Sequence, residues 1–466
     1  MNNNELIEIL EDWNFWEKNL ETGISRNNYL DILEKRLPGE QIKVIIGARR
    51  SGKSYIMRQL AEWLMKKKGI NKNNILIINF EDPRFTGLDT KLLQQIFDVY
   101  LETRKPSGST YVFLDEIQEI PNWEKWVRTA QELGKFNIVV SGSNSKLLSG
   151  ELATVLTGRH LDTTVMPLSF TEFLKFKKLE IKNHLEFSRK KIELKSLFRE
   201  FLEFGSFPLV VLGQDKKSIL LSYFDDVVNK DLIKRYKIRK TEEIKKLIKF
   251  YLSNISSPIT FTSSGKFLNM PALSIERFST YLETSYLVFF LKRFSFKVKE
   301  QEKSPRKVYS IDTGLANTAG FRFSGNLGRL AENAVFLELK RRACLNPDME
   351  IYYWKNREQE EVDFVVKENT EIRKLLQVCW DITDMKTKKR EIKALLKAMK
   401  EFDLKKGIVI TEDFEGEEIY GGNKIQYVPL RKWLLGLRKF KNRPARLDEL
   451  ARLERRRGGD LVHFEV

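Results

Sequence analysis

The residues best suited to chemistry lie in a segment bounded by two glycines. It follows the apolar run at residues 42–46 and reads Gly47-Ala48-Arg49-Arg50-Ser51-Gly52-Lys53-Ser54. Glycines let a backbone curl closely around phosphate oxygens, and the helix predicted to follow adds unpaired N–H groups and the positive end of its dipole. In such a loop the lysine meets the β- and γ-phosphates of a nucleotide, and the serine hydroxyl is a ligand of Mg²⁺. We therefore predict that this whole segment binds a nucleotide, with Lys53 on the phosphates and Ser54 on the metal.

Two adjacent acids can supply the metal ligand and the carboxylate base that hydrolysis of a bound nucleotide requires. Asp115 and Glu116 directly follow the apolar run at residues 111–114. A strand that ends there delivers Asp115 to the Mg²⁺ beside the loop and Glu116 to a position where a carboxylate orients or deprotonates the attacking water. Paired acids also occur at strand ends on ordinary surfaces, but together with the loop they predict a hydrolytic centre.

Three further polar residues follow the next predicted strand, residues 137–141. Ser143 and Asn144 can hydrogen-bond the attacking water or the γ-phosphate, and Arg159 can stabilise charge on the transferring phosphoryl group, in its own subunit or in a neighbouring one. Small polar residues also end strands as plain turns, and loop arginines are often solvated, so both interpretations stay open for each residue.

The elements that would position these residues change in type along the chain. Its 466 residues allow roughly two to four domains. After an N-terminal helical segment at residues 1–40, β-branched runs alternate with helical stretches over residues 41–187, which predicts a P-loop domain with a parallel α/β sheet.

Two further domains and a tail are predicted beyond residue 187. Residues 188–320 are mainly helical and end in two β-like runs around a charged segment, a pattern that indicates a winged helix-turn-helix. Residues 321–440 form a second, smaller α/β domain. Residues 441–466 are a basic tail, and the segment 431–466 has eleven basic residues against five acidic ones.

Several motifs together resemble one known family. The segments GARRSGKS, INFEDPRF, FLDEIQEIPNWEKWVR, VVSGSNSKLLSGE and GRHLDTTVMPLSFTEFL are similar to those of bacterial and archaeal AAA-like ATPases that end in a domain of unknown function with a nuclease-like fold. The resemblance extends from Gly23 to Leu437. It implies an additional-strand P-loop sheet, ATP and Mg²⁺ as ligands, and Glu116 as the catalytic glutamate. Only the resemblance favours adenine over guanine.

The resemblance continues through the predicted winged helix. Residues 274–282 are expected to form the recognition helix, with Ser274 as its N-cap and Ile275, Phe278 and Leu282 on one face. A group of basic residues near the wing is expected to rest on phosphates, namely Lys297, Lys299, Lys303, Arg306 and Lys307. Winged helices also dock proteins, so DNA and protein both remain candidate partners.

The second α/β domain resembles the PD-(D/E)xK nuclease core but departs from it. Glu332 and Asp363 match acids that hold Mg²⁺ there, whereas Gln377 stands where a carboxylate is expected and Cys379 where the lysine is expected. An amide brings no charge and a thiol cannot replace an ammonium. We expect a degenerate nuclease-like site used for binding or assembly, unless Lys386 or Lys388 supplies the missing lysine.

Composition indicates the kind of partner and the cellular compartment to expect. Lysine and arginine (82) exceed aspartate and glutamate (64), giving a net charge of +18, which favours polyanions such as DNA as partners. Cys344 and Cys379 are the only cysteines and form no C-x-x-C pair, which fits a reducing cytoplasm. No signal peptide or membrane span is predicted, and a protein partner or a homo-oligomer stays open.

The sequence thus predicts an ATPase that couples hydrolysis of Mg-ATP to conformational change in the winged-helix and nuclease-like regions. Two alternatives of different classes remain. One is a nucleotide-gated binding switch with little turnover, and the other is an ATP-dependent nuclease or DNA-processing factor.

Overall fold

Five parallel strands form the centre of the N-terminal domain. The computed structural model describes residues 1–134, 136–143, 158–321 and 327–437. The strands lie in the order β2-β3-β4-β1-β5, with bounds β1 (Ile42–Gly47), β2 (Ile75–Asn79), β3 (Tyr111–Asp115), β4 (Asn137–Gly142) and β5 (His160–Val165). Their apolar runs are buried on both faces, as parallel sheets require. Strand β4 separates β1 from β3, which confirms the additional-strand P-loop order.

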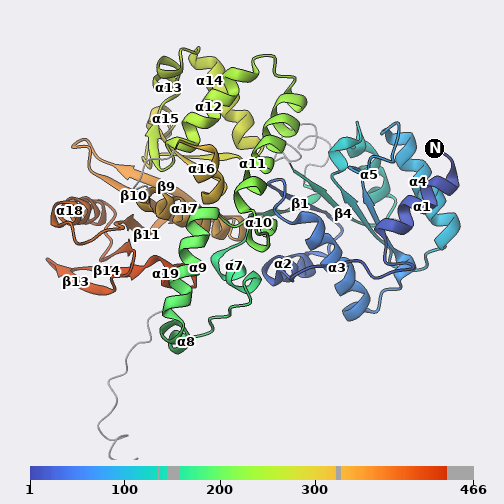
Figure 1. Cartoon of the computed structure of the whole chain (residues 1–466), viewed down its shortest axis with the longest axis horizontal. Helices are drawn as coiled ribbons and strands as arrows, with labels where there is room; N and C mark the ends of the chain where they lie inside the picture. Colours follow the sequence, from blue (N-terminus) through green and yellow to red (C-terminus); the bar gives the residue numbers. More distant parts are fainter. Residues whose placement is uncertain (135, 144–157, 322–326, 438–466) are drawn as a thin grey trace, which may run out of the picture.

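Helices cover both faces of this sheet (Figure 1). On one face lie α2 (Asn27–Arg36) and α3 (Lys53–Lys68), and on the other α1 (Asn3–Trp13), α4 (Thr90–Arg104) and α5 (Trp123–Glu132). Short 3₁₀ turns, η1 (Lys72–Asn74) and η2 (Ile117–Glu119), precede β2 and follow β3. The N-terminal segment is part of this layer, since the Trp16 indole donates a hydrogen bond to the carbonyl of Ile75.

A mainly helical middle region follows. Its first helices are α7 (Phe170–Phe176), α8 (His184–Arg189), α9 (Lys191–Phe204), α10 (Pro208–Leu212) and α11 (Lys216–Asp226), and the last of these runs into the π-helix η4 (Val227–Lys234). Then come α12 (Thr241–Ser253), α13 (Phe261–Leu268), α14 (Ala272–Thr284) and α16 (Thr313–Ala319). A three-stranded antiparallel sheet in the order β6-β8-β7 accompanies them, with β6 (Ser257–Ile259), β7 (Val288–Leu291) and β8 (Arg306–Ser310).

Two expectations for this region were wrong in detail. Helix α14 begins at Ala272 after Pro271, so Ser274 lies inside its first turn and does not cap it. The charged segment between β7 and β8 contains the short helix α15 (Val298–Lys303) rather than a plain hairpin tip. The expected apolar face of α14 is buried, because Ile275, Phe278 and Leu282 pack into the core.

The C-terminal domain is a six-stranded mixed sheet in the order β13-β14-β12-β11-β10-β9, which confirms a second α/β domain. Its strands are β9 (Met349–Lys355), β10 (Glu361–Glu368), β11 (Glu371–Val378), β12 (Lys406–Thr411), β13 (Gly416–Tyr420) and β14 (Asn423–Pro429). Its helices are α17 (Leu327–Leu345), α18 (Met385–Glu401) and α19 (Leu430–Leu434).

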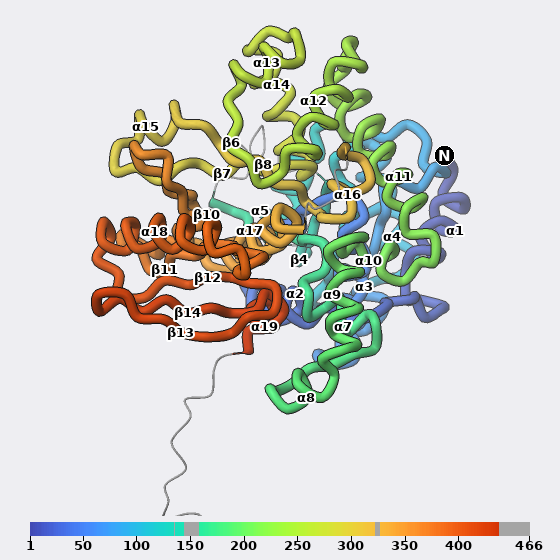
Figure 2. The backbone as a smooth tube through the Cα atoms, turned by 60° about the vertical axis from the view of Figure 1, so that its left-hand side comes forward, coloured from blue at the N-terminus to red at the C-terminus, as the bar shows by residue number. Residues whose placement is uncertain are grey.

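The middle region and the C-terminal domain are joined through their backbones. The N–H of Phe294 donates to the carbonyl of Tyr353 at 2.6 Å, and the N–H of Tyr353 donates to the carbonyl of Lys292 at 3.1 Å. Figure 2 shows the resulting stack, with β7 and β8 above β10 and with α18 on the outer face of the C-terminal sheet. Within the described ranges no helix is long and apolar enough to cross a membrane. The predicted basic tail at 441–466 lies outside the described residues.

Candidate nucleotide site

The loop between β1 and α3 has the backbone of a phosphate-binding loop. Gly47 has φ +149°, and a Cβ there would lie 2.1 Å from the carbonyl oxygen of Val165 on the neighbouring strand. Gly52 has φ +96° and directly precedes the first residue of α3. Both positions therefore require glycine. The loop turns tightly and leaves the N-terminus of α3 facing outward.

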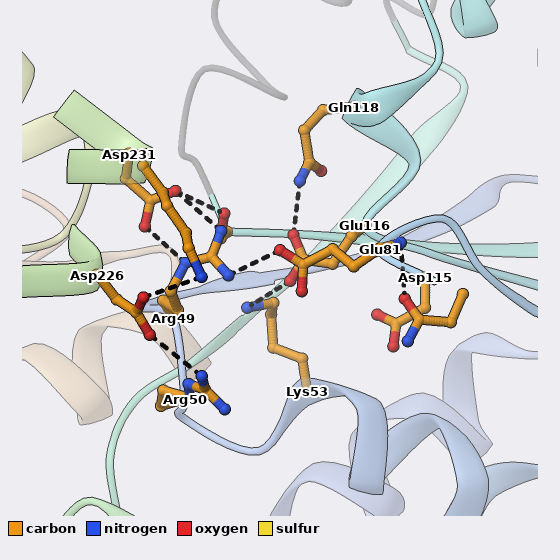
Figure 3. Close-up of polar contacts among 12 residues, drawn as sticks. Arg49, Arg50, Lys53, Glu81, Asp115, Glu116, Gln118, Asp226 and Asp231 are labelled. Carbon is orange, nitrogen blue, oxygen red and sulfur yellow. Dashed lines mark hydrogen bonds and ion pairs between the residues drawn. The ribbon is translucent and has the colours of Figure 1, made fainter. Parts of the chain in front are cut away.

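Lys53 folds back over this loop. Its side chain is 4% exposed, and its Nζ lies 3.3 Å from Oε1 of Glu116 and 3.3 Å from the carbonyl oxygen of Gly47. Figure 3 shows the ammonium between the loop and the end of β3. The structure thus brings together the loop lysine and the glutamate that the sequence analysis considered as separate motifs.

Asp115 and Glu116 are held by β4, the strand next to theirs. The Ser141 hydroxyl donates to Oδ1 of Asp115 and accepts the backbone N–H of Glu116 at 3.2 Å. The amide of Gln118 donates to Oε2 of Glu116 at 2.6 Å. Glu116 itself has φ +52°, which turns its side chain toward Lys53. Sequence reasoning did not single out Ser141 or Gln118 for these roles. The only signal for Ser141 was its place at the end of a strand adjacent to β3.

The surroundings shift the pKa values of Asp115 and Glu116 in opposite directions. Burial, together with the neighbouring charge of Glu116, raises the pKa of Asp115 above its ordinary value. Burial also opposes ionisation of Glu116, but the charge of Lys53 and the hydrogen bond from Gln118 outweigh it and lower the pKa of that carboxyl. Glu116 is therefore a carboxylate at neutral pH.

The residues at this edge fit a magnesium ion. The Ser54 hydroxyl lies close enough to Asp115 to favour its ionised form and oppose the rise in its pKa, so a hydroxyl and a carboxylate are neighbours here. Hard oxygen donors of this kind are what Mg²⁺ selects. The Ser51 hydroxyl, in the same loop, is buried and has no hydrogen-bond partner among the described residues, which fits a loop shaped for a ligand.

The two loop arginines point to the middle region. Arg49 pairs with Asp231 of η4 at 2.9 Å and with Glu81 at 2.7 Å, and Arg50 pairs with Asp226 of α11 at 3.1 Å (Figure 3). Burial opposes the charge of Arg49, but the hydrogen bond and charge of Asp231 raise its pKa above the ordinary value. Sequence reasoning placed both arginines in the loop but gave no sign of their acidic partners.

A cavity of about 1080 Å³ opens between the loop and the middle region. Lys53, Ser54 and Glu116 line one side, and Lys234 and Arg235 line the other. Nη1 of Arg235 lies 3.4 Å from Oδ1 of Asp231 but makes no hydrogen bond with any described residue. The cavity is large enough for a nucleotide and combines basic groups from two parts of the chain.

Of three further predicted residues, the structure brings Ser143 next to Asp231, the partner of Arg49, and leaves Arg159 away from the loop. Arg159 immediately precedes β5, at the end of the sheet opposite the loop, and its side chain pairs with Glu132, so the structure does not bring it to the P-loop of its own subunit. The Ser143 hydroxyl lies 3.4 Å from Oδ1 of Asp231. Asn144 lies outside the described residues.

The nuclease-like residues form a separate cluster. Glu332 of α17 and Asp363 of β10 lie together with Glu361, and Lys307 of β8 contacts all three. Lys307 is thus buried and not on the wing surface, contrary to expectation. Burial opposes its charge, yet Asp363 and Glu332 hold the pKa of Lys307 well above the ordinary value.

Gln377 and Cys379, the two residues that depart from the nuclease pattern, have different neighbours. The Gln377 carbonyl accepts the backbone N–H of Asp363 at 3.1 Å, so it lies beside the acids. Cys379 is buried, and its Sγ contacts the carbonyl of Asp381 at 3.6 Å. Lys388 pairs with Glu418 at 2.6 Å and so is engaged away from the acids. No group of three or more His, Cys, Asp or Glu side chains among the described residues is arranged to hold a metal ion.

Comparison with known proteins covers most of the chain. Residues 39–174 match an AAA domain, and residues 195–326 and 327–433 match two domains of unknown function, DUF8612 and DUF4143. An uncharacterized protein of Methanocaldococcus jannaschii is 38% identical over 421 residues, which cover 86% of this chain and 90% of that protein. An uncharacterized protein of Haemophilus influenzae is 31% identical over 422 residues, which cover 88% and 98%.

One solved structure is also similar. The Walker-type ATPase of Pyrococcus abyssi matches 63% of this chain and 95% of its own chain, with 12% identity and a TM-score of 0.39. At that score the similarity supports no argument about this chain.

Proposed function

Because the chain belongs to the family of AAA-domain proteins that carry DUF8612 and DUF4143 regions, we propose that it hydrolyses ATP to ADP and phosphate. The observation that carries the proposal is the contact between Lys53 and Glu116 at the edge of the large cavity. A phosphate-binding cation and a carboxylate base meet there, beside the Ser54 and Asp115 oxygens.

Each residue then has a distinct part in the reaction. Lys53 exchanges Glu116 for the β- and γ-phosphates, since both are anions competing for one ammonium. Loss of that cation makes Glu116 a stronger base, and its carboxylate accepts a proton from the attacking water. Mg²⁺, held by Ser54 and Asp115, supplies neutralisation of phosphate charge when bound.

We further propose that ATP binding moves the middle region. Phosphate oxygens compete with Asp231 and Asp226 for Arg49 and Arg50, the arginines that tie the loop to η4 and α11. Releasing those ion pairs frees η4, whose π-helical turn is a less stable form of helix. Arg235, across the cavity, is proposed to take the phosphate-facing role first assigned to Arg159.

The test is steady-state phosphate release by the full chain and its Lys53→Ala variant, with Lys66→Ala as control because Lys66 is an exposed lysine of the same helix. Turnover by the wild type and the control, lost in Lys53→Ala, supports the proposal. Tight ATP binding with no turnover in the wild type would instead favour the nucleotide-gated switch.

Nucleic acid is proposed as a partner on charge alone. Lys297, Lys299 and Lys303 are exposed around α15, and the whole chain carries a net charge of +18. The same assay with duplex DNA decides this point: stimulation that weakens steeply with salt supports a polyanion partner, and no effect at low salt removes it.

A further inference from the structure

The acids of the nuclease-like domain are already occupied by a cation from this chain. We infer that the Lys307 ammonium takes the place of the divalent metal ion in that centre, so that the acids fasten the middle region to the C-terminal domain and do not form a metal-dependent hydrolytic site. This inference does not depend on the proposed ATPase function.

The geometry is that of a filled site. Nζ of Lys307 lies 2.9 Å from Oε1 of Glu332, 2.7 Å from Oε1 of Glu361 and 2.8 Å from Oδ1 of Asp363. An ammonium has three N–H donors, and here each can meet a different carboxylate. The Lys307 side chain is 1% exposed, so water and substrate do not reach it.

Neighbouring groups also donate to these carboxylates, in the case of Glu332 to the same oxygen that Lys307 contacts. The Tyr309 hydroxyl donates to Oε1 of Glu332 at 2.7 Å, and the backbone N–H of Val378 donates to Oδ2 of Asp363 at 2.8 Å. Nζ of Lys355 lies 3.4 Å from Oε2 of Glu361. A metal ion would have to displace these donors as well as the ammonium.

The side-chain amide of Gln377 is also engaged by groups of this chain. Gln377 accepts the N–H of Asp363 and donates to Oε2 of Glu391 at 2.5 Å. It therefore bridges β10 and helix α18 by hydrogen bonds and adds no charge toward a cation. The centre therefore has one carboxylate fewer than the nuclease pattern expects at this position, which weakens it as a site for a divalent ion.

A relocated catalytic lysine is the competing explanation. Such a lysine lies beside the metal ion and keeps contact with water. Lys307 instead contacts all three acids at once and is buried, so it occupies the cation position itself. Because Lys307 comes from β8 of the middle region and the acids from α17 and β10, the contact also holds the two parts together.

The experiment compares metal binding by nucleotide-free full chains, with Mn²⁺ as the probe read by electron paramagnetic resonance. The variants are Lys307→Met, which keeps the apolar stem, and Asp363→Asn in both backgrounds. In the wild type we expect no Mn²⁺ signal that depends on Asp363. In Lys307→Met we expect a site that appears with Mn²⁺ and is lost again in the Lys307→Met/Asp363→Asn double variant.

Thermal unfolding and cleavage assays complete the test. Lys307→Met should lower the Tm by about 5 °C or more, since it leaves the buried Asp363 and the partly buried Glu332 and Glu361 without their cation, and Mn²⁺ should recover part of that loss. The inference would be overturned if the wild type bound Mn²⁺ in a way that depends on Asp363. It would also be overturned if the wild type cleaved DNA or RNA and Lys307→Met did not. A folded Lys307→Met chain that binds no Mn²⁺ would also overturn it. If Lys307→Met does not fold, the wild-type and Asp363→Asn measurements still decide.

Discussion

Nε of Arg49 lies 2.9 Å from Oδ2 of Asp231, and this ion pair joins the phosphate-binding loop to the π-helix of the middle region. Asp231 is 2% exposed, so the pair is screened little by solvent. The loop that is expected to hold phosphate is thus in contact with a carboxylate of the middle region. The proposed link between nucleotide binding and the position of the middle region depends on this ion pair and on the neighbouring pair of Arg50 with Asp226.

Neutralising Asp231 should strengthen nucleotide binding. In Asp231→Asn the phosphate no longer competes with a charge for Arg49, and we expect ATP affinity to rise roughly 3- to 10-fold, measured by calorimetric titration. Asp225→Asn is the matched control, because Asp225 is an exposed acid of the adjoining helix α11. Weaker binding in Asp231→Asn would mean that the acid positions Arg49 for phosphate and does not compete with it.

A buried ion pair behind the loop should make stability depend on pH. Arg26 pairs with Glu172 at 2.8 Å and also donates to the carbonyl of Ser51 in the loop. Burial opposes ionisation of Glu172, but Arg26 outweighs it and lowers the pKa of the carboxyl below its usual 4.5. Since the folded pKa is depressed, the stabilisation is complete above the unfolded value and is lost as pH falls through the folded one.

Glu172→Gln should remove that pH dependence. Breaking a buried pair leaves the Arg26 charge uncompensated, and we expect a loss of about 3–5 kcal/mol in unfolding free energy at pH 7. Urea unfolding between pH 3 and 7 measures both effects. Asp12→Asn, which removes an exposed partner of Lys18 and Arg84, should change the unfolding free energy little. Equal losses in the two variants would contradict the account.

The first loop glycine should be intolerant of a methyl group. A Cβ at Gly47 would lie 2.1 Å from the Val165 carbonyl oxygen, whereas one at Gly69 would meet nothing within 4 Å. Both have φ in the left-handed region, so Gly69→Ala pays only backbone strain, about 1–2 kcal/mol. Gly47→Ala adds a clash with a neighbouring strand, and we expect a larger fall in Tm and loss of ATP binding. Similar Tm values for the two variants would show that β5 shifts to make room for the added methyl group, and would contradict the prediction.

Local sequence patterns were enough to predict the residues of the site that lie at strand ends. The loop, Asp115 and Glu116 follow buried apolar runs, and the carboxyl ends of the strands that these runs form lie at one edge of the sheet. The sheet order was not readable from the strands themselves, since register and neighbours depend on contacts between distant segments. It came from the family resemblance.

The contacts that sequence reasoning missed join residues far apart in the sequence. Asp231 lies 182 positions from Arg49, and Lys307 lies 56 positions from Asp363. No local pattern distinguishes these two residues from the many solvated acids and lysines of the chain. Lys307 was expected on a wing surface because of the basic residues around it. In β8, however, every residue from Lys307 to Ser310 is buried, so neither face of the strand at this position is exposed.

The role of Glu116 is the central claim, and measuring ATP binding and phosphate release in one preparation of Glu116→Gln tests it most directly. Glutamine keeps the shape and the hydrogen bond to Gln118 but cannot take a proton, so binding should persist while turnover falls by about 100-fold or more relative to the wild type. Turnover at the wild-type rate in Glu116→Gln would contradict the account.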